Sequence, residues 1–239
     1  MIEGIELSKR FEGRVLFENF NFKIESGEFV CFSGVSGCGK TTLLNMIGMI
    51  EPFDSGKLLI DGEAMVTQKQ RMQYFRKKLG FLFQNFALVE NKTVEQNLKL
   101  IRKQDRTSLT MEEALKRVGL SDVLKQKVYT LSGGEQQRVA LARLFFKQSE
   151  IILADEPTGS LDEANADRIM QILKELHQEG KTIILVTHDI SVVSAMADTL
   201  LVLKEGQVME YGVAKQVLEA PENEYTRKLL AAVPRLRRI

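Results

Sequence analysis

The chain has 239 residues, and its 33 lysines and arginines nearly balance its 32 aspartates and glutamates, giving a formal net charge of +1. That length suits one large domain or two small ones, and the charge balance gives no electrostatic reason to expect nucleic acid as a partner. No run approaches the ~18 consecutive apolar residues of a membrane-spanning helix, and the N-terminal residues predict no signal peptide. Cys31 and Cys38 are too few for a disulfide framework or a closed zinc site, so we expect a soluble protein of a reducing compartment.

Short strand-like runs alternate with longer helical runs along the chain. Continuous apolar runs such as Ile151–Ala154 and Ile183–Val186 suit strands buried on both faces of a parallel sheet. The early runs alternate between apolar and polar residues, which suits an antiparallel sheet with one face in water. In chain order, the predicted strands are Ile2–Leu7, Leu16–Ile24, Glu28–Ser33, Lys57–Ile60, Leu79–Phe83, Ile151–Ala154, Thr182–Val186, Thr199–Leu203 and Gln207–Glu210.

Several helices have recognisable starts. Thr93 and Thr110 each stand three residues before a Gln or a Glu, which is the spacing of a capping box. We expect Leu88–Leu131 to be almost wholly helical, as an insert in an α/β core. Glu163–Glu179 is predicted to be one amphipathic helix, because its apolar residues recur at three- and four-residue spacing. Since no Pro/Gly-rich linker is present, we expect one compact unit with a helical lobe rather than two independent domains.

A glycine-rich run follows the predicted strand Glu28–Ser33 and precedes an apolar helical run. Its residues Gly34–Thr41 match the pattern G-x-x-x-x-G-K-[ST] in the required strand–loop–helix setting. Backbone N–H groups and the helix N-terminus would bind phosphate oxygens, Lys40 would reach the β- and γ-phosphates, and the Thr41 hydroxyl would ligate Mg²⁺. The alternative is a glycine-rich turn beside an ordinary lysine.

The apolar run Ile151–Ala154 ends in two carboxylates, Asp155 and Glu156. Asp155 is placed to hold Mg²⁺, and Glu156 is placed to orient or deprotonate an attacking water. Alone, an acidic turn after a core strand would explain the pair equally well. The phosphate loop upstream favours the functional interpretation.

The run Leu131–Arg138 contains a third capping box, in which Ser132 precedes Glu135 by three residues at the start of a helix predicted over Gln136–Phe146. A Gly-Gly pair at a helix start costs backbone entropy, which is reasonable where another group must approach the backbone closely. The free N–H groups and the dipole of this helix would favour an anion. A second phosphate-facing helix start indicates a nucleotide held between two copies of the chain.

Together these runs resemble the ATP-binding cassette of ABC transporters, over residues 1 to about 220. The Leu131–Arg138 run resembles the signature motif of that family. The resemblance implies an α/β fold of the P-loop NTPase type, with a mixed sheet core, an antiparallel β-subdomain and a helical lobe. The expected single nucleotide-binding domain comprises a core with its β-subdomain at 1–84 and 132–220, a lobe at about 85–131 and a helical tail at 221–239.

The resemblance extends to residues outside these runs. Gln84 resembles the glutamine near Mg²⁺ and water, Ser160-Leu161-Asp162 resembles the loop that crosses to the other subunit, and His188 resembles the switch histidine. Phe11 stands where many relatives have a tyrosine that stacks on adenine. Taken singly, Asp162 also suits a helix N-cap, His188 a strand end, Phe11 a core position, and Gln84 carries little meaning. The resemblance implies catalytic roles for Glu156, His188, Gln84 and Asp162, Mg²⁺ ligation by Thr41, Gln84 and Asp155, and ATP binding by Phe11, Ser36, Gly37, Cys38, Gly39, Lys40, Thr41, Thr42, Ser132, Gly134 and Glu135.

The resemblance also implies partners. Two copies would form a head-to-tail dimer, with two ATP molecules between the phosphate loop of one subunit and Ser132–Glu135 of the other. A separate membrane-spanning permease would dock at the Gln84–Thr93 region, which places the chain at the cytoplasmic face of a membrane. The expected function is ATP hydrolysis that energises this permease, with no nucleic acid involved. ABC-type repair ATPases need a long coiled-coil insert, for which the interval between Lys40 and Ser132 has no room.

Different runs point to different cargoes. Glu156–Asp162 is similar to cassettes of macrolide-export, lipoprotein-release and cell-division types, and Phe83–Val94 to those of bacteriocin and antimicrobial-peptide transporters. We therefore expect export of, or defence against, peptides or amphiphiles. Tyr225–Pro234 is similar to the end of oligopeptide-importer cassettes, so an importer ATPase stays open. A regulatory cassette that drives a cell-wall hydrolase through a membrane partner stays open as well.

Overall fold

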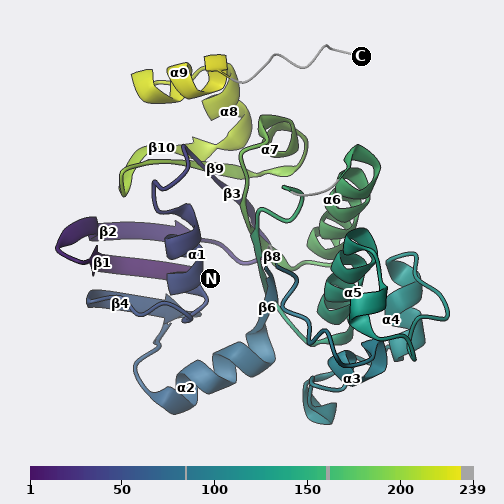
Figure 1. Cartoon of the computed structure of the whole chain (residues 1–239). Coiled ribbons are helices and arrows are strands. Elements are labelled where there is room, and N and C mark those ends of the chain that lie inside the picture. Colours follow the sequence, from purple (N-terminus) through teal and green to yellow (C-terminus); the bar gives the residue numbers. More distant parts are fainter. Residues whose placement is uncertain (84, 160–161, 233–239) are drawn as a thin grey trace. The chain divides into compact units, whose positions relative to one another are not determined.

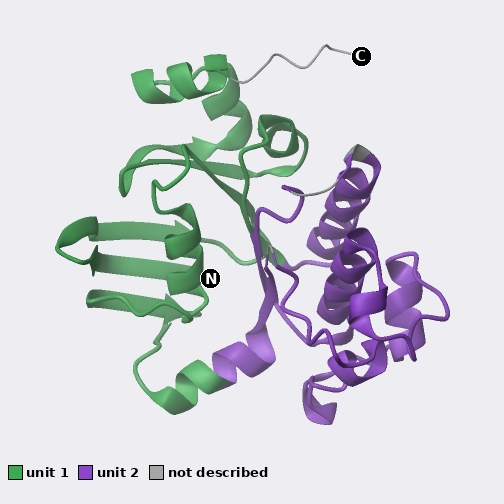
Figure 2. Cartoon of the chain, viewed as in Figure 1, with its two compact units in different colours: residues 1–72, 182–239 green, residues 73–181 purple. Residues whose placement is uncertain are grey.

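The structure is a computed structural model that describes residues 1–83, 85–159 and 162–232. The chain divides into two compact units, one formed by Met1–Met72 and Thr182–Ile239 and the other by Gln73–Lys181 (Figure 2). The division expected from sequence, with a lobe at about 85–131, stays a prediction.

The N-terminal part of the first unit is an antiparallel sheet with the strand order β2-β1-β4-β5 (Figure 1). Burial alternates along β2, as the sequence pattern predicts for a sheet with one face in water. The two-residue strand β5 has no counterpart among the predicted strands. The bounds are β1 (Ile2–Phe11), β2 (Arg14–Ile24), β4 (Ser55–Ile60) and β5 (Glu63–Ala64).

A second sheet in the first unit has the order β10-β9-β3-β8. Here β3 pairs in parallel with both β8 and β9, whereas β10 pairs with β9 in antiparallel fashion. Every residue of β8 is buried, as its continuous apolar run predicts. The bounds are β3 (Phe29–Ser33), β8 (Thr182–Val186), β9 (Thr199–Lys204) and β10 (Gln207–Val213). Helices that lie wholly in this unit include α1 (Lys40–Ile47), α7 (Ile190–Met196), α8 (Ala214–Glu219) and α9 (Glu224–Ala232).

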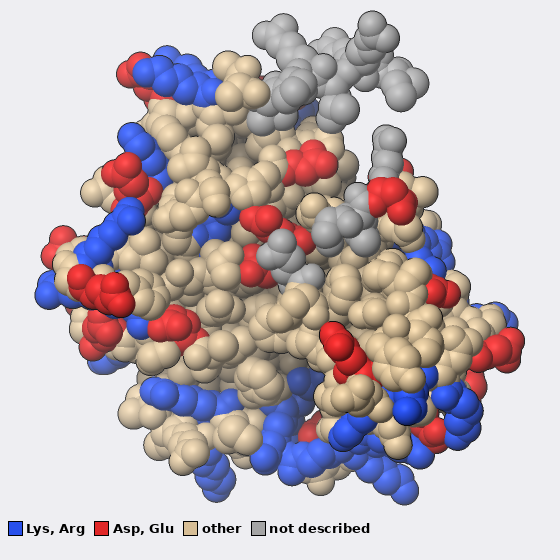
Figure 3. Space-filling view, in the orientation of Figure 1, with Lys and Arg blue, Asp and Glu red and all other residues tan. Residues whose placement is uncertain are grey.

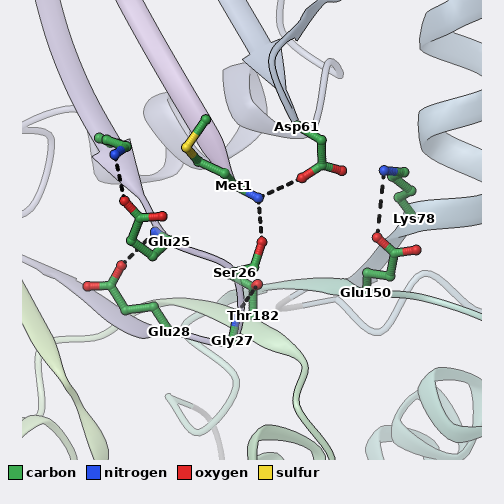
Figure 4. Close-up of polar contacts among 10 residues, drawn as sticks. Met1, Glu25, Ser26, Gly27, Glu28, Asp61, Lys78, Glu150 and Thr182 are labelled. Carbon is green, nitrogen blue, oxygen red and sulfur yellow. Dashed lines mark hydrogen bonds and ion pairs between the residues drawn. The ribbon is translucent and has the colours of Figure 1, made fainter.

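Polar contacts at the turns secure the strands of the first unit (Figure 4). The N-terminal ammonium of Met1 donates to Ser26 Oγ at 2.5 Å and to Asp61 Oδ1 at 2.7 Å. The N–H of Gly27 donates to Thr182 Oγ1 at 2.9 Å, which joins the turn before β3 to the start of β8. These bonds tie the turn at Ser26 and Gly27, which leads into β3, to the N-terminus and to the first residue of β8.

The second unit contains a parallel strand pair, β6 (Leu79–Leu82) and β7 (Ile151–Asp155). The helix α5 (Gly133–Phe146) packs against α4 (Met111–Arg117) and α6 (Glu163–Gln178) (Figure 1). An ion pair of 3.7 Å between Lys78 and Glu150 joins the segments that precede the two strands (Figure 4). The chain enters this unit through α2 (Gln68–Gln73), which continues into a π-helical turn at Tyr74–Lys78.

The prediction that Leu88–Leu131 is almost wholly helical is wrong. Its α-helices are α3 (Val94–Leu98) and α4, and 3₁₀ turns lie at Lys103–Asp105 and Val128–Thr130. Much of the remaining chain is fixed by pairing with distant backbone. The carbonyl oxygen of Gln126 accepts a bond from the N–H of Val94 at the start of α3, and Arg106 forms a β-bridge with Lys147. Such tertiary pairing favours extended backbone in these connections. Helix propensity, which depends only on local sequence, does not predict it.

None of the helices in the described residues combines the length and the apolar character needed to cross a bilayer.

Candidate nucleotide-binding site

The predicted phosphate loop joins β3 to α1 in the first unit. Gly34 has a φ of 143°, and a Cβ at this position would lie 2.2 Å from the carbonyl oxygen of Leu203. Gly39 has a φ of 110°, caps the N-terminus of α1, and would place a Cβ 2.8 Å from the Phe17 ring. Both positions therefore require glycine, and the loop lies directly against β2 and β9.

The Lys40 side chain folds into this loop. It is 4% exposed, and its ammonium donates to the carbonyl oxygens of Gly34 at 2.9 Å and Val35 at 3.0 Å. These two acceptors offset part of the cost of burying the charge. The loop thus holds a fixed positive charge beside the N-terminus of α1, which suits an anion. Of the other predicted loop residues, Ser36, Gly37 and Thr41 are exposed, Thr42 is half-buried, and Cys38 and Gly39 are buried.

His188 follows β8 and is exposed. Because Phe32 of β3 pairs in parallel register with Val186 of β8, the phosphate loop and His188 leave the sheet at the same edge. Ligands of open α/β sheets bind at this carboxyl edge. The next residue, Asp189, accepts a bond from the Ser191 N–H at 2.8 Å and so caps α7. The structure therefore brings His188 to the edge of the sheet that carries the phosphate loop.

Phe11 ends β1 and is 43% exposed, so a core position is excluded. The Lys9 ammonium lies 4.6 Å from the centroid of the Phe11 ring and is held there by Glu51 at 2.5 Å. A cation on a ring is a favourable contact, and it orients the aromatic side chain. The neighbouring strand β2 carries Phe17, against which Gly39 of the loop rests.

In the second unit, the half-buried carboxylates Asp155 and Glu156 lie at the carboxyl end of β7. Glu156 has a φ of 43°, a left-handed conformation that non-glycine residues rarely adopt and that clusters at functional sites. The turn is held from α5, because the Gln137 side-chain amide donates to the carbonyl oxygen of Pro157. The side chains are thus placed on a constrained turn.

The predicted capping box at the start of α5 is confirmed. Ser132 Oγ accepts from the Glu135 N–H at 3.3 Å, and the Glu135 carboxylate accepts from the Ser132 N–H at 2.9 Å and hydroxyl at 2.7 Å. The hydroxyl bond, the N–H bond and the nearby Arg138 hold the pKa of Glu135 below its usual range. Ser132 and Gly133 are exposed, and nothing lies within 4 Å of the position that a Gly133 Cβ would take.

Asp162, the N-cap of α6, joins the α5 start through Asn165. The Asp162 carboxylate accepts from the Asn165 N–H at 2.9 Å and from its side-chain amide at 2.7 Å, which lowers the pKa of Asp162. Asn165 Oδ1 accepts from Arg138 at 2.6 Å. The N-cap interpretation of Asp162 is therefore correct, and the same carboxylate is linked to the Ser132–Glu135 segment.

The predicted residues Gln84, Ser160 and Leu161 lie outside the described residues. Sequence reasoning missed Asn165, which the D-x-x-N spacing identifies only as part of a cap, and Tyr225. The Tyr225 hydroxyl accepts a 3.4 Å bond from the Val35 N–H of the phosphate loop. No local pattern indicates these tertiary contacts.

Comparison with known proteins gives a consistent result. Residues 17–159 match the family model described as ABC transporter. The macrolide export ATP-binding/permease protein MacB of Mannheimia succiniciproducens is 39% identical over 221 residues, which cover 88% of this chain and 34% of that protein. The L-cystine transport system ATP-binding protein TcyN of Escherichia coli is 33% identical, with 96% of each chain covered. A dimeric post-hydrolysis structure of the ATP-binding cassette MJ0796, bound to ADP and Pi, has a TM-score of 0.79 at 33% identity and covers 90% of this chain and 99% of that one.

The chain belongs to the ABC transporter family and is an ATP-binding cassette, the ATPase component of that family. The expected family, fold class and enzyme class are thereby confirmed. The chain spans about a third of the length of the macrolide exporters that it matches.

Proposed function

We propose that this chain hydrolyses ATP as a head-to-tail dimer and drives a membrane-spanning transporter subunit. The observation that carries the proposal is the presence of two helix starts suited to phosphate, one at α1 and one at α5. The α1 start holds the buried Lys40 ammonium, and the α5 start exposes Ser132 and Gly133. Because each ATP needs both kinds of helix start in a sandwich dimer, we assign the α5 start to the nucleotide of the second copy.

Lys40, Thr41 and Asp155 would hold the nucleotide with Mg²⁺. The Thr41 hydroxyl and the Asp155 carboxylate are oxygen donors, the chemistry that Mg²⁺ prefers, and we include Gln84 in the same role. No group of three or more His, Cys, Asp or Glu suited to a metal occurs within the ranges 1–83, 85–159 and 162–232. When bound, Mg²⁺ neutralises charge on the β- and γ-phosphate oxygens.

Glu156 and His188 would carry the chemical step. A Glu156 carboxylate oxygen accepts the proton of the attacking water, and Asp155 on the same turn remains a metal ligand. His188 orients the γ-phosphate from the edge of the sheet that carries the phosphate loop. Phe11 stacks on adenine, with Lys9 fixing its ring. Asp162, Ser132, Gly134 and Glu135 complete the site of the partner copy.

A groove in the second unit supports a membrane partner. It has a volume of about 430 Å³, with apolar side chains such as Leu79, Phe81 and Leu144 and cations such as Arg102 and Lys147. Lys and Arg side chains gather over the lower part of this unit in Figure 3. The lining residue Phe83 directly precedes the Gln84–Thr93 region. We propose that a cytoplasmic segment of the permease, carrying apolar and acidic side chains, docks here at the membrane surface.

For the cargo, we propose peptides or amphiphiles moved outward. The similarity to macrolide exporters and the run Glu156–Asp162 support export. The similarity to the L-cystine transport protein, whose name states no direction, leaves the importer alternative open. A photo-crosslinker placed at the exposed groove residue Leu100 would capture the membrane partner, whose topology decides between them.

The dimer and the catalytic carboxylate are tested together with Glu156→Gln. The amide keeps the shape of the side chain but cannot act as a base, so ATP should bind, turnover should stop, and a dimer should accumulate on size-exclusion chromatography. Lys40→Ala should instead lose nucleotide affinity, because it removes a phosphate-facing charge. A Glu156→Gln protein that turns over ATP at the parental rate contradicts the assignment.

A further inference from the structure

Asn165 occupies an unusual position in the second unit, because its contacts connect two predicted site segments. Its N–H and its side-chain amide both donate to the Asp162 carboxylate, at 2.9 and 2.7 Å. Its Oδ1 accepts a 2.6 Å bond from Arg138 in the second turn of α5. The first pair of bonds is an ordinary helix cap, but the bond to Arg138 connects residues 27 positions apart.

The same side chain lies against the backbone of the α5 start. A Cβ at Gly134 would be 3.1 Å from Asn165 Oδ1 and 3.3 Å from Nδ2, closer than nine in ten real Cβ contacts. The amide therefore sits where a side chain at position 134 would project. Arg138 also lies near Glu135 of the capping box, so one guanidinium connects the cap of α5 to Asn165.

From this geometry we propose that Asn165 is a positioning residue, which holds the Ser132–Glu135 segment and Asp162 in one fixed arrangement for the nucleotide of the partner copy. The inference rests on the proposed head-to-tail dimer. An amide suits the position because it donates to a carboxylate and accepts from a guanidinium at once. Aspartate would lose the donor and place two carboxylates together, and alanine would lose both bonds.

If Asn165 has this positioning role, its substitution should weaken dimer formation without changing the affinity of the monomer for nucleotide. Of the residues proposed to hold the nucleotide of a single copy, Lys40 and Phe11 belong to the first unit, and Asp155 ends β7 rather than lying on α5 or α6, where Asn165 makes its bonds. The nucleotide affinity of a single copy should therefore not depend on Asn165. Dimer closure should depend on it, because both segments it holds face the second copy. A purely structural residue would instead change stability and both binding steps alike.

We would test this in the Glu156→Gln background, where ATP-bound dimers accumulate. The variants are Asn165→Ala and the isosteric Asn165→Asp. The matched control is Gln171→Ala, an exposed amide on the same helix whose Oε1 accepts a 3.2 Å bond from Arg168. A fluorescent ATP analogue would report monomer affinity, thermal melting would report stability, and analytical ultracentrifugation with ATP would report the dimer Kd.

Both Asn165 variants should bind the analogue with parental affinity and raise the dimer Kd by about tenfold or more, while the control leaves it unchanged. Lower pH should partly restore dimerisation of Asn165→Asp, because protonation of the new carboxyl removes its repulsion from Asp162. Parental dimerisation in both variants, or an equal loss of monomer affinity, would overturn the positioning role. If the Glu156→Gln background itself fails to dimerise with ATP, the proposed dimer is what fails.

Discussion

Replacing Gly39 with alanine tests how the phosphate loop is held. Alanine at a φ of 110° is strained by about 1–2 kcal/mol. Its methyl group would also lie 2.8 Å from the ring of Phe17, which is 1% exposed and cannot turn into solvent. Overpacking of this kind costs about 1–3 kcal/mol. The expected total loss in the free energy of unfolding is therefore about 2–5 kcal/mol. If the phosphate loop moves away from Phe17 to relieve the overpacking, ATP binding should weaken as well.

Urea unfolding of Gly39→Ala and of Gly62→Ala separates the cost of backbone strain from the cost of overpacking against Phe17. Gly62 has a φ of 80° but no atom within 4 Å of its Cβ position, so Gly62→Ala should lose stability through backbone strain alone. Shortening the opposing ring with Phe17→Leu should relieve part of the Gly39→Ala loss in a double-mutant cycle. Equal destabilisation at positions 39 and 62, or no coupling to Phe17, would refute the steric argument.

Three further results are expected. Maleimide should label Cys38 slowly because the thiol is buried, and bound ATP should slow this labelling further. Cys31, which is also buried, should react only after unfolding, and mass spectrometry of the labelled peptides would distinguish the two sites. Tyr225→Phe should raise the Kd for ATP by about 2- to 10-fold, because the bond to the Val35 N–H is lost, and calorimetry would measure this. Burial lowers the pKa of Lys147 to about 8, so the unfolded chain binds more protons between pH 8 and 10.5. Between pH 7 and 10 the stability of the parental chain should therefore rise by about 2 kcal/mol relative to that of Lys147→Met, as urea unfolding of both proteins at each pH would show.

Each result has a control and an opposing outcome. Tyr211→Phe removes a hydroxyl that donates to Lys23 O at 2.7 Å, away from the loop, and should leave ATP affinity unchanged. Equal effects of the two tyrosine variants would contradict a role for α9 at the loop. Labelling of Cys38 at the rate of the unfolded chain would contradict its burial. An unchanged pH dependence in Lys147→Met would contradict the lowered pKa.

Sequence predicts the strands well because their signals are local. The apolar run at Thr182–Val186 marks a buried parallel strand to the residue, and the alternation in β2 marks a half-exposed one. It fails for β5, a two-residue strand formed only by pairing with β4. It fails also for the connections in Leu88–Leu131, where tertiary backbone pairing replaces helix. The roles of the motif residues stay predictions, and the Arg138–Asn165 bond, which joins the segment Leu131–Arg138 to the cap of α6, leaves no trace in local spacing.

The three capping boxes illustrate why motif spacing alone does not identify an anion site. Thr93, Thr110 and Ser132 make the same reciprocal bonds in the structure. At α3, however, the first-turn N–H groups of Val94 and Glu95 already donate to the carbonyl oxygens of Gln126 and Leu124. At α5 the first two helical residues are glycines, and the space beside Gly133 is open. A box therefore predicts where a helix begins, whereas the availability of its N–H groups, which tertiary structure decides, determines whether phosphate can bind there.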